Sequence, residues 1–140
     1  MKNQYNIPCN IAQTLNVIGD KWTLLILHEI LLGNRTYKEL QERLDGIPTN
    51  LLSERLKALE KDELIKSVLY QNHPPRYEYV LTEGGKDLTD VFNSLIIWGE
   101  KYVKKCKKQI KHIECGHKVV HQYYCPECKK VVNREEVKVE

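Results

Sequence analysis

GIPTNLLSERLKALEKDELIKSVLYQNHPPRYEYVLT, residues 46–82, carries the clearest structural pattern in this 140-residue chain. After an opening turn, Leu52, Leu56 and Leu59 recur at i, i+4 and i+7, which places them on one apolar face of a helix. The opposite face carries polar side chains, namely Asn50, Ser53, Glu54, Lys57 and Lys61. The pattern therefore predicts an amphipathic helix with one buried side and one polar side.

Two short β-runs follow this helix. Residues 64–70 and 76–81 alternate in polarity and are rich in Val, Ile, Leu and Tyr, as half-buried strands are. The loop between them contains Pro74 and Pro75, which lack the backbone N–H donor that a central strand needs. A polar-faced helix followed by a hairpin is the plan of a winged helix-turn-helix, in which the helix enters a DNA major groove and the hairpin tip touches the flanking backbone.

The chain before residue 46 predicts three further helices, over residues 10–18, 21–32 and 37–44. Asp20 is placed to cap the second helix, and Thr36 begins the third with a capping box. Because the second helix is apolar almost all round, we expect it to be the buried centre of the domain.

Thr82 is suited to cap a long helix that runs to about Cys106. An apolar stripe follows it, made of Leu88, Val91, Leu95, Trp98 and Tyr102. The stripe is longer than one small domain needs to cover, so it favours a homodimer seam over packing against the first helix of the same chain. Six lysines in residues 101–111 are interpreted first as a solvated helix end and second as phosphate contacts.

Bulk composition fits a globular protein, since 41% of residues are hydrophobic and 29% are charged. No apolar run approaches a membrane span and the first residues do not resemble an export signal, so we expect a cytoplasmic location and no membrane partner. Residues 1–100 carry eleven basic and fourteen acidic side chains, a net −3, whereas residues 101–140 carry eleven and five, a net +6. DNA binding by the first part must therefore come from a few well-placed basic groups.

Candidate DNA contacts come from the polar helix face and the hairpin. Asn50 can read adenine, hydroxyls can contact bases or phosphates, and lysine neutralises phosphate. Arg76 is the best candidate in the hairpin, and Arg55, beside the apolar helix face, is expected to brace the helix instead. The predicted contacts are Thr49, Asn50, Ser53, Lys57, Arg76 and, more weakly, His73.

These motifs together resemble the HxlR family of winged-helix transcriptional regulators and the wider MarR-like group. The resemblance covers roughly residues 7–104, and its most specific segments are residues 18–22, 51–56 and 74–79. It implies an α+β fold, a winged helix-turn-helix with a long C-terminal dimerisation helix. It also implies a homodimer that binds an inverted-repeat operator in double-stranded DNA and represses or activates transcription.

Cys9 lies just before the first predicted helix, where members of this family often carry a cysteine, and in some of them this thiol senses oxidants or electrophiles. A helix N-terminus lowers a thiol pKa, which would make Cys9 more reactive. In this chain the order is Pro8-Cys9 and not Cys-Pro, and an unreactive thiol in the dimer seam is the alternative interpretation.

The tail contains two short knuckles, His112-x2-Cys115 and Cys125-x2-Cys128, with nine residues between them. A two-residue gap lets both ligands of a knuckle reach one ion, so the spacing predicts a closed, structural Zn²⁺ site held by these four side chains. His117 or His121 could take the place of His112. The alternatives are free thiols or a redox pair, which is less favoured because no βαβ pattern surrounds it. We expect residues 119–124 to form a small hairpin between the knuckles.

The predicted organisation is thus a DNA-binding and dimerisation domain over residues 1–106 and a zinc-ribbon-like appendage over residues 107–140. The predicted function is a sequence-specific DNA-binding transcriptional regulator with a possible small-molecule or oxidant effector. The alternative is a protein-interaction module that docks onto transcription machinery. An enzyme is not expected, because the sequence shows no paired general acid and base and no Gly-rich phosphate loop.

Overall fold

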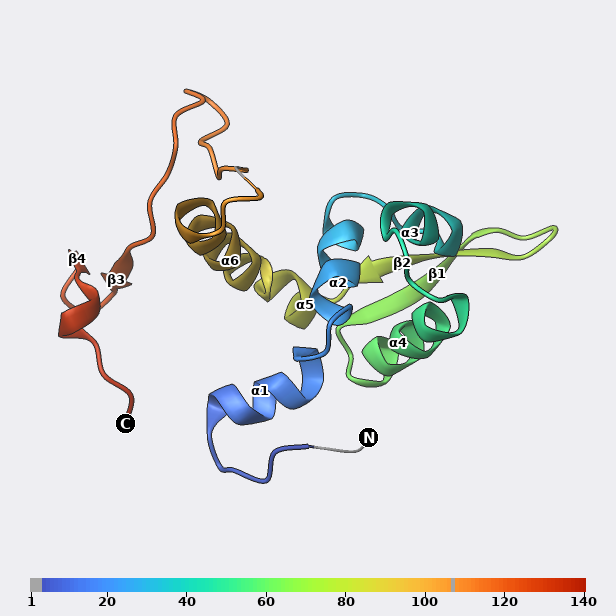
Figure 1. The fold of residues 1–140 in the computed structure, drawn as a ribbon, viewed down its shortest axis with the longest axis horizontal. Coiled ribbons are helices and arrows are strands. Elements are labelled where there is room, and N and C mark those ends of the chain that lie inside the picture. The colour runs from blue at the N-terminus through green and yellow to red at the C-terminus, as the bar shows by residue number, and fades with distance from the viewer. Residues whose placement is uncertain (1–3, 107) are drawn as a thin grey trace. The chain divides into compact units, whose positions relative to one another are not determined.

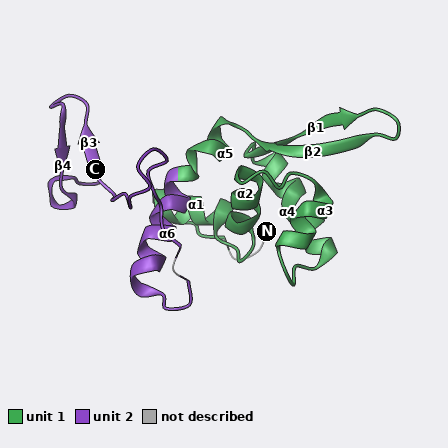
Figure 2. Ribbon diagram, turned by 90° about the horizontal axis from the view of Figure 1, so that it is seen from above, with its two compact units in different colours: residues 1–89 green, residues 90–140 purple. Residues whose placement is uncertain are grey.

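The computed structural model describes residues 4–106 and 108–140 and divides into two compact units, one ending at Thr89 and one beginning at Asp90 (Figures 1 and 2). This division groups the last long helix with the tail, whereas the sequence predicts a domain boundary after Cys106. That boundary stays a prediction about independent folding, and Lys107 beside it lies outside the described residues.

The first unit begins with four helices that match the predicted ones closely. Their bounds are α1 Asn10–Ile18, α2 Thr23–Leu31, α3 Tyr37–Arg43 and α4 Thr49–Lys61. α2 begins at Thr23, two residues later than predicted, and its N-cap residue is Trp22 and not Asp20. Asp20 still caps the turn that leads into α2, because its Oδ1 accepts the N–H groups of Trp22 at 2.8 Å and Thr23 at 3.1 Å. Thr36 starts α3 with the expected capping box, its Oγ1 accepting the Glu39 N–H at 3.2 Å while Glu39 accepts the Thr36 N–H at 3.0 Å.

The core of the first unit lies on the inner faces of these helices. The predicted stripe of α4, Leu52, Leu56 and Leu59, is fully buried, and α2 is indeed central. The other fully buried side chains are Thr23, Ile26, Leu27, Ile30, Leu40 and Ile65. Truncating one such leucine to alanine costs about 2–5 kcal/mol in general, so the position of α4 is strongly determined. Among the described residues, no helix is both long and apolar enough to cross a membrane.

The predicted hairpin is present as β1 Ile65–Gln71 and β2 Arg76–Leu81, an antiparallel pair. Its register runs from Ile65 opposite Leu81 to Gln71 opposite Arg76, with an irregularity between Leu69 and Gln71. The two ends that lie nearest the core are buried, and the hairpin tip extends past α3 and α4 (Figure 1). The fold of this unit is therefore a winged helix-turn-helix, as predicted.

The expected single helix from Thr82 to about Cys106 is wrong in detail. Thr82 caps a short helix, α5 Glu83–Asp87, and a second helix, α6 Thr89–Tyr102, follows after an interruption at Leu88. At this break the Leu88 N–H turns back to the Gly85 carbonyl at 3.2 Å, and the Thr89 hydroxyl donates to the Lys86 carbonyl at 2.6 Å. A threonine hydroxyl that bonds to a nearby carbonyl competes with the helix ladder, which accounts for the break.

The tail differs from expectation in its pairing. Residues 119–120 do not pair with residues 123–124. Instead β3 Tyr123–Cys125 pairs antiparallel with β4 Lys130–Val132, and a short 3₁₀ helix, Arg134–Glu136, follows. The turn from Cys125 to Lys130 pairs the residues on its two sides with each other. The strands therefore flank the second knuckle, and they do not lie between the two knuckles.

Candidate nucleic-acid interface

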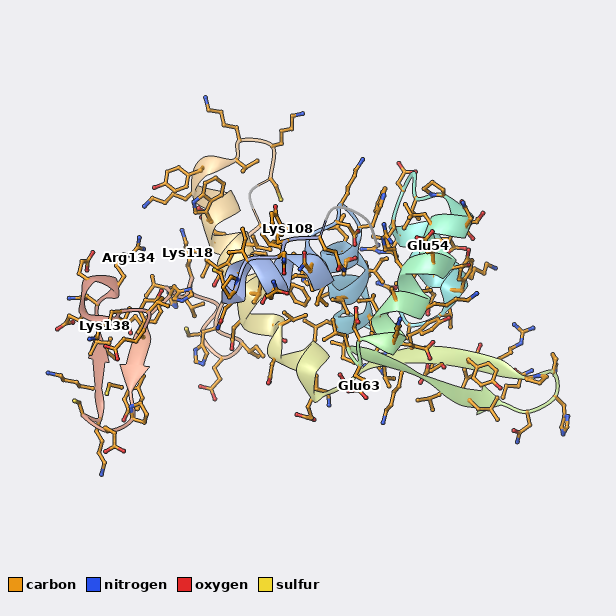
Figure 3. All side chains as sticks on the ribbon, turned by 90° about the horizontal axis from the view of Figure 1, so that it is seen from below. Glu54, Glu63, Lys108, Lys118, Arg134 and Lys138 are labelled. Atoms are coloured by element: carbon orange, nitrogen blue, oxygen red, sulfur yellow. The ribbon has the colours of Figure 1, made fainter. Side chains whose placement is uncertain are left out.

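The polar face of α4 is exposed along the helix, opposite the three buried leucines. Thr49, Asn50 and Lys57 are all exposed, as the sequence predicts for groups that touch DNA. Among the ion pairs of the described residues, Lys57 takes part in none. Glu54 also lies on the outside of α4 (Figure 3), where its carboxylate pairs with Arg55 at 3.4 Å. The surface therefore offers an amide and an ammonium group to a partner, with one carboxylate partly neutralised.

Tyr37 holds the start of α4 against α3. Its hydroxyl donates a hydrogen bond to the Thr49 carbonyl at 2.7 Å and accepts one from the Ser53 hydroxyl at 3.4 Å. Ser53 is half-buried, and its hydroxyl is engaged with Tyr37. Tyr37 is not recognisable from the sequence as a functional residue, because an aromatic residue in the first turn of a helix has no distinctive spacing.

Arg55 braces α4 from inside, as its place beside the apolar face suggested. Its Nε lies 3.3 Å from Asp20 Oδ2, which pairs the two charges without a well-aligned hydrogen bond. Burial acts to raise the Asp20 pKa. The bonds from the Thr23 hydroxyl and the Trp22 N–H, with the Arg55 charge, outweigh it and hold that pKa below its ordinary value. One carboxylate thus caps α2 and fixes the orientation of α4.

Removing this carboxylate should lower the free energy of unfolding and make that free energy depend less on pH. We expect Asp20→Asn to lower the free energy of unfolding at pH 7 by about 1–3 kcal/mol, the range for a lost cap and charged hydrogen bonds. The folded pKa lies below the roughly 3.9 of an unfolded aspartate. The stabilisation is therefore complete above about pH 4 and is lost as the pH falls through the folded value.

Urea unfolding of both proteins between pH 3 and pH 7 measures this effect. The difference between wild type and Asp20→Asn should shrink as the pH falls toward 3. Asp87→Asn, an exposed acid at the end of α5, serves as the control and should change the unfolding free energy by less than about 0.5 kcal/mol. If the unfolding free energy of Asp20→Asn fell toward pH 3 as steeply as that of wild type, the role assigned to Asp20 would be wrong.

The hairpin, or wing, is tied to the helices at its base. The Tyr79 N–H of β2 donates to the Arg35 carbonyl at 2.7 Å, and the Ser67 hydroxyl of β1 donates to Glu60 of α4 at 3.3 Å. Arg76 opens β2 beside the tip and is exposed. His73 is exposed within the tip itself. Both predicted wing contacts therefore lie where a flanking DNA backbone or minor groove could reach them.

Two helices present apolar side chains on the surface. On α1 the exposed fractions of Ile11 and Leu15 are 72% and 42%. On α6 the exposed fractions of Leu95 and Trp98 are 53% and 60%, and the Tyr102 ring centroid lies 5.1 Å from that of Trp98, with the rings tilted by 44°. Large apolar side chains grouped along one helix commonly mark an interaction surface.

Cys9 occupies the N-cap position of α1 and is exposed. The N–H groups of Ala12 and, to a smaller extent, Ile11 lower the pKa of its thiol. A larger thiolate fraction makes Cys9 a better nucleophile near neutral pH than an ordinary cysteine.

The four predicted metal ligands come together only as two pairs. His112 Nδ1 lies 3.3 Å from Cys115 Sγ, and Cys125 Sγ accepts the Cys128 N–H at 3.4 Å. Within residues 4–106 and 108–140, no three His, Cys, Asp or Glu side chains lie close enough to hold one metal ion. The four-ligand zinc site therefore stays a prediction at this point.

Comparison with known proteins gives consistent matches. Residues 17–107 match the family described as HxlR-like helix-turn-helix. The chain is 35% identical over 122 residues to the uncharacterized HTH-type transcriptional regulator Rv3095 of Mycobacterium tuberculosis, covering 85% of this chain and 77% of that protein. It is similar to the crystal structure of PA1607, with a TM-score of 0.80, 26% identity and 96% of each chain covered. It is also similar to the redox regulator HypR in its reduced form, with a TM-score of 0.64, 29% identity, and coverage of 69% of this chain and 95% of that one.

Proposed function

The chain belongs to the HxlR-like helix-turn-helix family, and from this premise we propose that it is a DNA-binding transcriptional regulator. It acts as a homodimer that reads an inverted-repeat operator in double-stranded DNA. One observation carries the proposal: α4 buries Leu52, Leu56 and Leu59 and presents Asn50 and Lys57 outward, with Arg76 on the neighbouring wing.

This arrangement fits the separate roles of base contacts and phosphate contacts in DNA binding. In helix-turn-helix proteins the recognition helix lies in the major groove with its N-terminal residues near the base edges. Asn50 lies in the first turn of α4, where an amide can bond bidentately to adenine. Lys57 and Arg76 supply the positive charge that phosphates require, because residues 1–100 carry no net positive charge to do so.

The homodimer is supported by the exposed apolar residues of α1 and α6. A two-fold axis would let each copy cover the same surface of the other and would place two recognition helices on two half-sites. Ile11 and Leu15 of α1 in the first unit are proposed as dimer contacts, and Leu95 and Trp98 of α6 in the second unit are proposed separately as dimer contacts.

A thiol response is proposed for Cys9. Its sulfur is exposed and its pKa is lowered, and it begins the helix that carries Ile11 and Leu15. Alkylation there, or a disulfide formed when an oxidant takes one hydrogen from Cys9 and one from a second thiol, would add bulk beside the proposed seam. The similarity to HypR, which is described as a redox regulator, supports this role.

The experiment is DNA binding by the purified protein with and without diamide. The probe is duplex DNA from upstream of the chain's own gene, competed against random duplex of equal length. We expect specific affinity at least about 10³ times tighter than non-specific affinity, the lower end for regulators. Diamide should weaken that binding in wild type and leave Cys9→Ser unaffected. Cys106→Ser, which removes another exposed thiol, is the matched control and should respond to diamide like wild type.

Binding without any preference over random DNA, even at low salt, would contradict the regulator and favour an interaction module docked on transcription machinery. If diamide weakened DNA binding equally in wild type and Cys9→Ser, only the proposed thiol response would be wrong.

A further inference from the structure

The segment after α6 has regular turns but no hydrophobic core of its own. Among its described residues, 108–140, none is buried, and the most covered side chains are only half-buried: Ile110, Val119, Cys125 and Val132. A two-stranded hairpin is marginal in water, and a unit of this size usually needs a metal or covalent links. Apolar burial alone therefore does not explain a fixed conformation here.

The first turn of the tail already holds a ligand pair. A nitrogen about 2.0 Å and a sulfur about 2.3 Å from one tetrahedral zinc lie roughly 3.5 Å from each other. The observed separation of His112 Nδ1 and Cys115 Sγ is 3.3 Å, close to that value. His121 is engaged elsewhere, with its Nδ1 3.2 Å from the Ser94 hydroxyl, so the geometry favours His112 as the nitrogen ligand.

The second turn repeats the backbone plan of the first. In the first, His112 donates its N–H to the His117 carbonyl at 2.9 Å, and Lys111 pairs with Lys118. In the second, the corresponding pairs are Cys125 with Lys130 and Tyr124 with Val131. The tail thus contains two equivalent turns, each with its ligand positions three residues apart.

The residue after each turn's last ligand has the same unusual conformation. Gly116 has φ +71° and Lys129 has φ +55°. A non-glycine residue rarely adopts positive φ. Its occurrence at Lys129, in the place of a glycine in the first turn, shows that the two turns share one geometry.

We propose that one zinc ion joins these two turns within a single chain, through His112, Cys115, Cys125 and Cys128. The nine residues between Cys115 and Cys125 can span about 30 Å when extended, so the linker permits closure. With four protein ligands the site has no open position and is structural. Binding releases up to three thiol protons to the buffer and leaves three thiolates and a neutral imidazole on the ion. This proposal is independent of DNA binding.

The test is metal content and cobalt titration of the full-length chain. Protein purified with zinc should hold one ion per chain by mass spectrometry, and metal-free protein should take one Co²⁺ per chain with the absorption of a tetrahedral thiolate site. Cys125→Ser, Cys128→Ser and His112→Ala should each weaken Co²⁺ binding by more than about 100-fold. Loss of a residue that only supports a metal ligand weakens metal affinity by at most about 100-fold, so a larger effect identifies a ligand. Cys9→Ser, Cys106→Ser and His117→Ala are matched controls and should bind like wild type.

Three results would overturn the proposal. The first is less than half an ion per chain after zinc loading. The second is unchanged cobalt absorption in Cys125→Ser and Cys128→Ser. The third is a site whose ligands come from two chains, which mixing His112→Ala and Cys125→Ser chains would reveal as restored cobalt absorption. Circular dichroism of each variant at neutral pH checks that the helical unit remains folded.

Discussion

Leu95→Glu combined with Trp98→Glu is expected to convert the dimer into a monomer and to weaken operator binding by about 10²–10⁴-fold. The apolar side chains of these residues are more than half exposed on α6, so the substitutions should be tolerated by the isolated chain. In the dimer they would bury charges without partners, which is strongly unfavourable. A monomer then binds each half-site alone and loses the effective concentration that linkage provides.

The measurements are sedimentation equilibrium and DNA titration at one salt concentration. Lys86→Glu is the matched control, because it changes the net charge by the same −2 while altering an exposed side chain of α5. The control should remain dimeric and should keep its affinity within a few-fold. If the double variant stays dimeric, the seam does not use α6.

The second large effect concerns α4 and the wing. We expect Asn50→Ala to cost about 1–3 kcal/mol at one operator position and to relax the preference for the base there. Lys57→Ala and Arg76→Ala should weaken binding about equally on all sequences. Each should also reduce the slope of log affinity against log salt by about 0.9, the value for one lost phosphate contact.

Titrations at four salt concentrations, on the operator and on single-base variants of it, separate these roles. Lys86→Ala removes the same charge from α5 and should leave the slope unchanged. A reduced slope in the Lys86 variant equal to that of Lys57→Ala would mean that general charge, and not a specific contact, determines binding. Preserved base preference in Asn50→Ala would exclude it from base reading.

The sequence predicted the helices and the wing well because each has a local signal. The leucine spacing of α4 and the capping box at Thr36 act over a few residues, and both are confirmed. The Pro74–Pro75 loop likewise placed the hairpin turn correctly. Such features need no knowledge of distant parts of the chain.

Features that depend on particular side-chain hydrogen bonds were not predictable. The break at Leu88 follows from a threonine hydroxyl that bonds to a carbonyl, a choice that the apolar stripe does not reveal. The Tyr37 contact that engages Ser53 joins residues sixteen positions apart. In the tail the Cys-x2-Cys spacing was plain, but the strands formed outside the knuckle because its tight turn fixes their register.

The most direct measurement of the proposed function is a hydroxyl-radical footprint of the wild-type protein on DNA upstream of its own gene. Dimeric binding predicts two protected segments related by a two-fold axis, with centres one helical turn or a small multiple apart. Protection should coincide with an inverted repeat and should disappear in Leu95→Glu, Trp98→Glu protein at the same concentration. Uniform weak protection along the fragment, or none, would contradict a dimeric sequence-specific regulator.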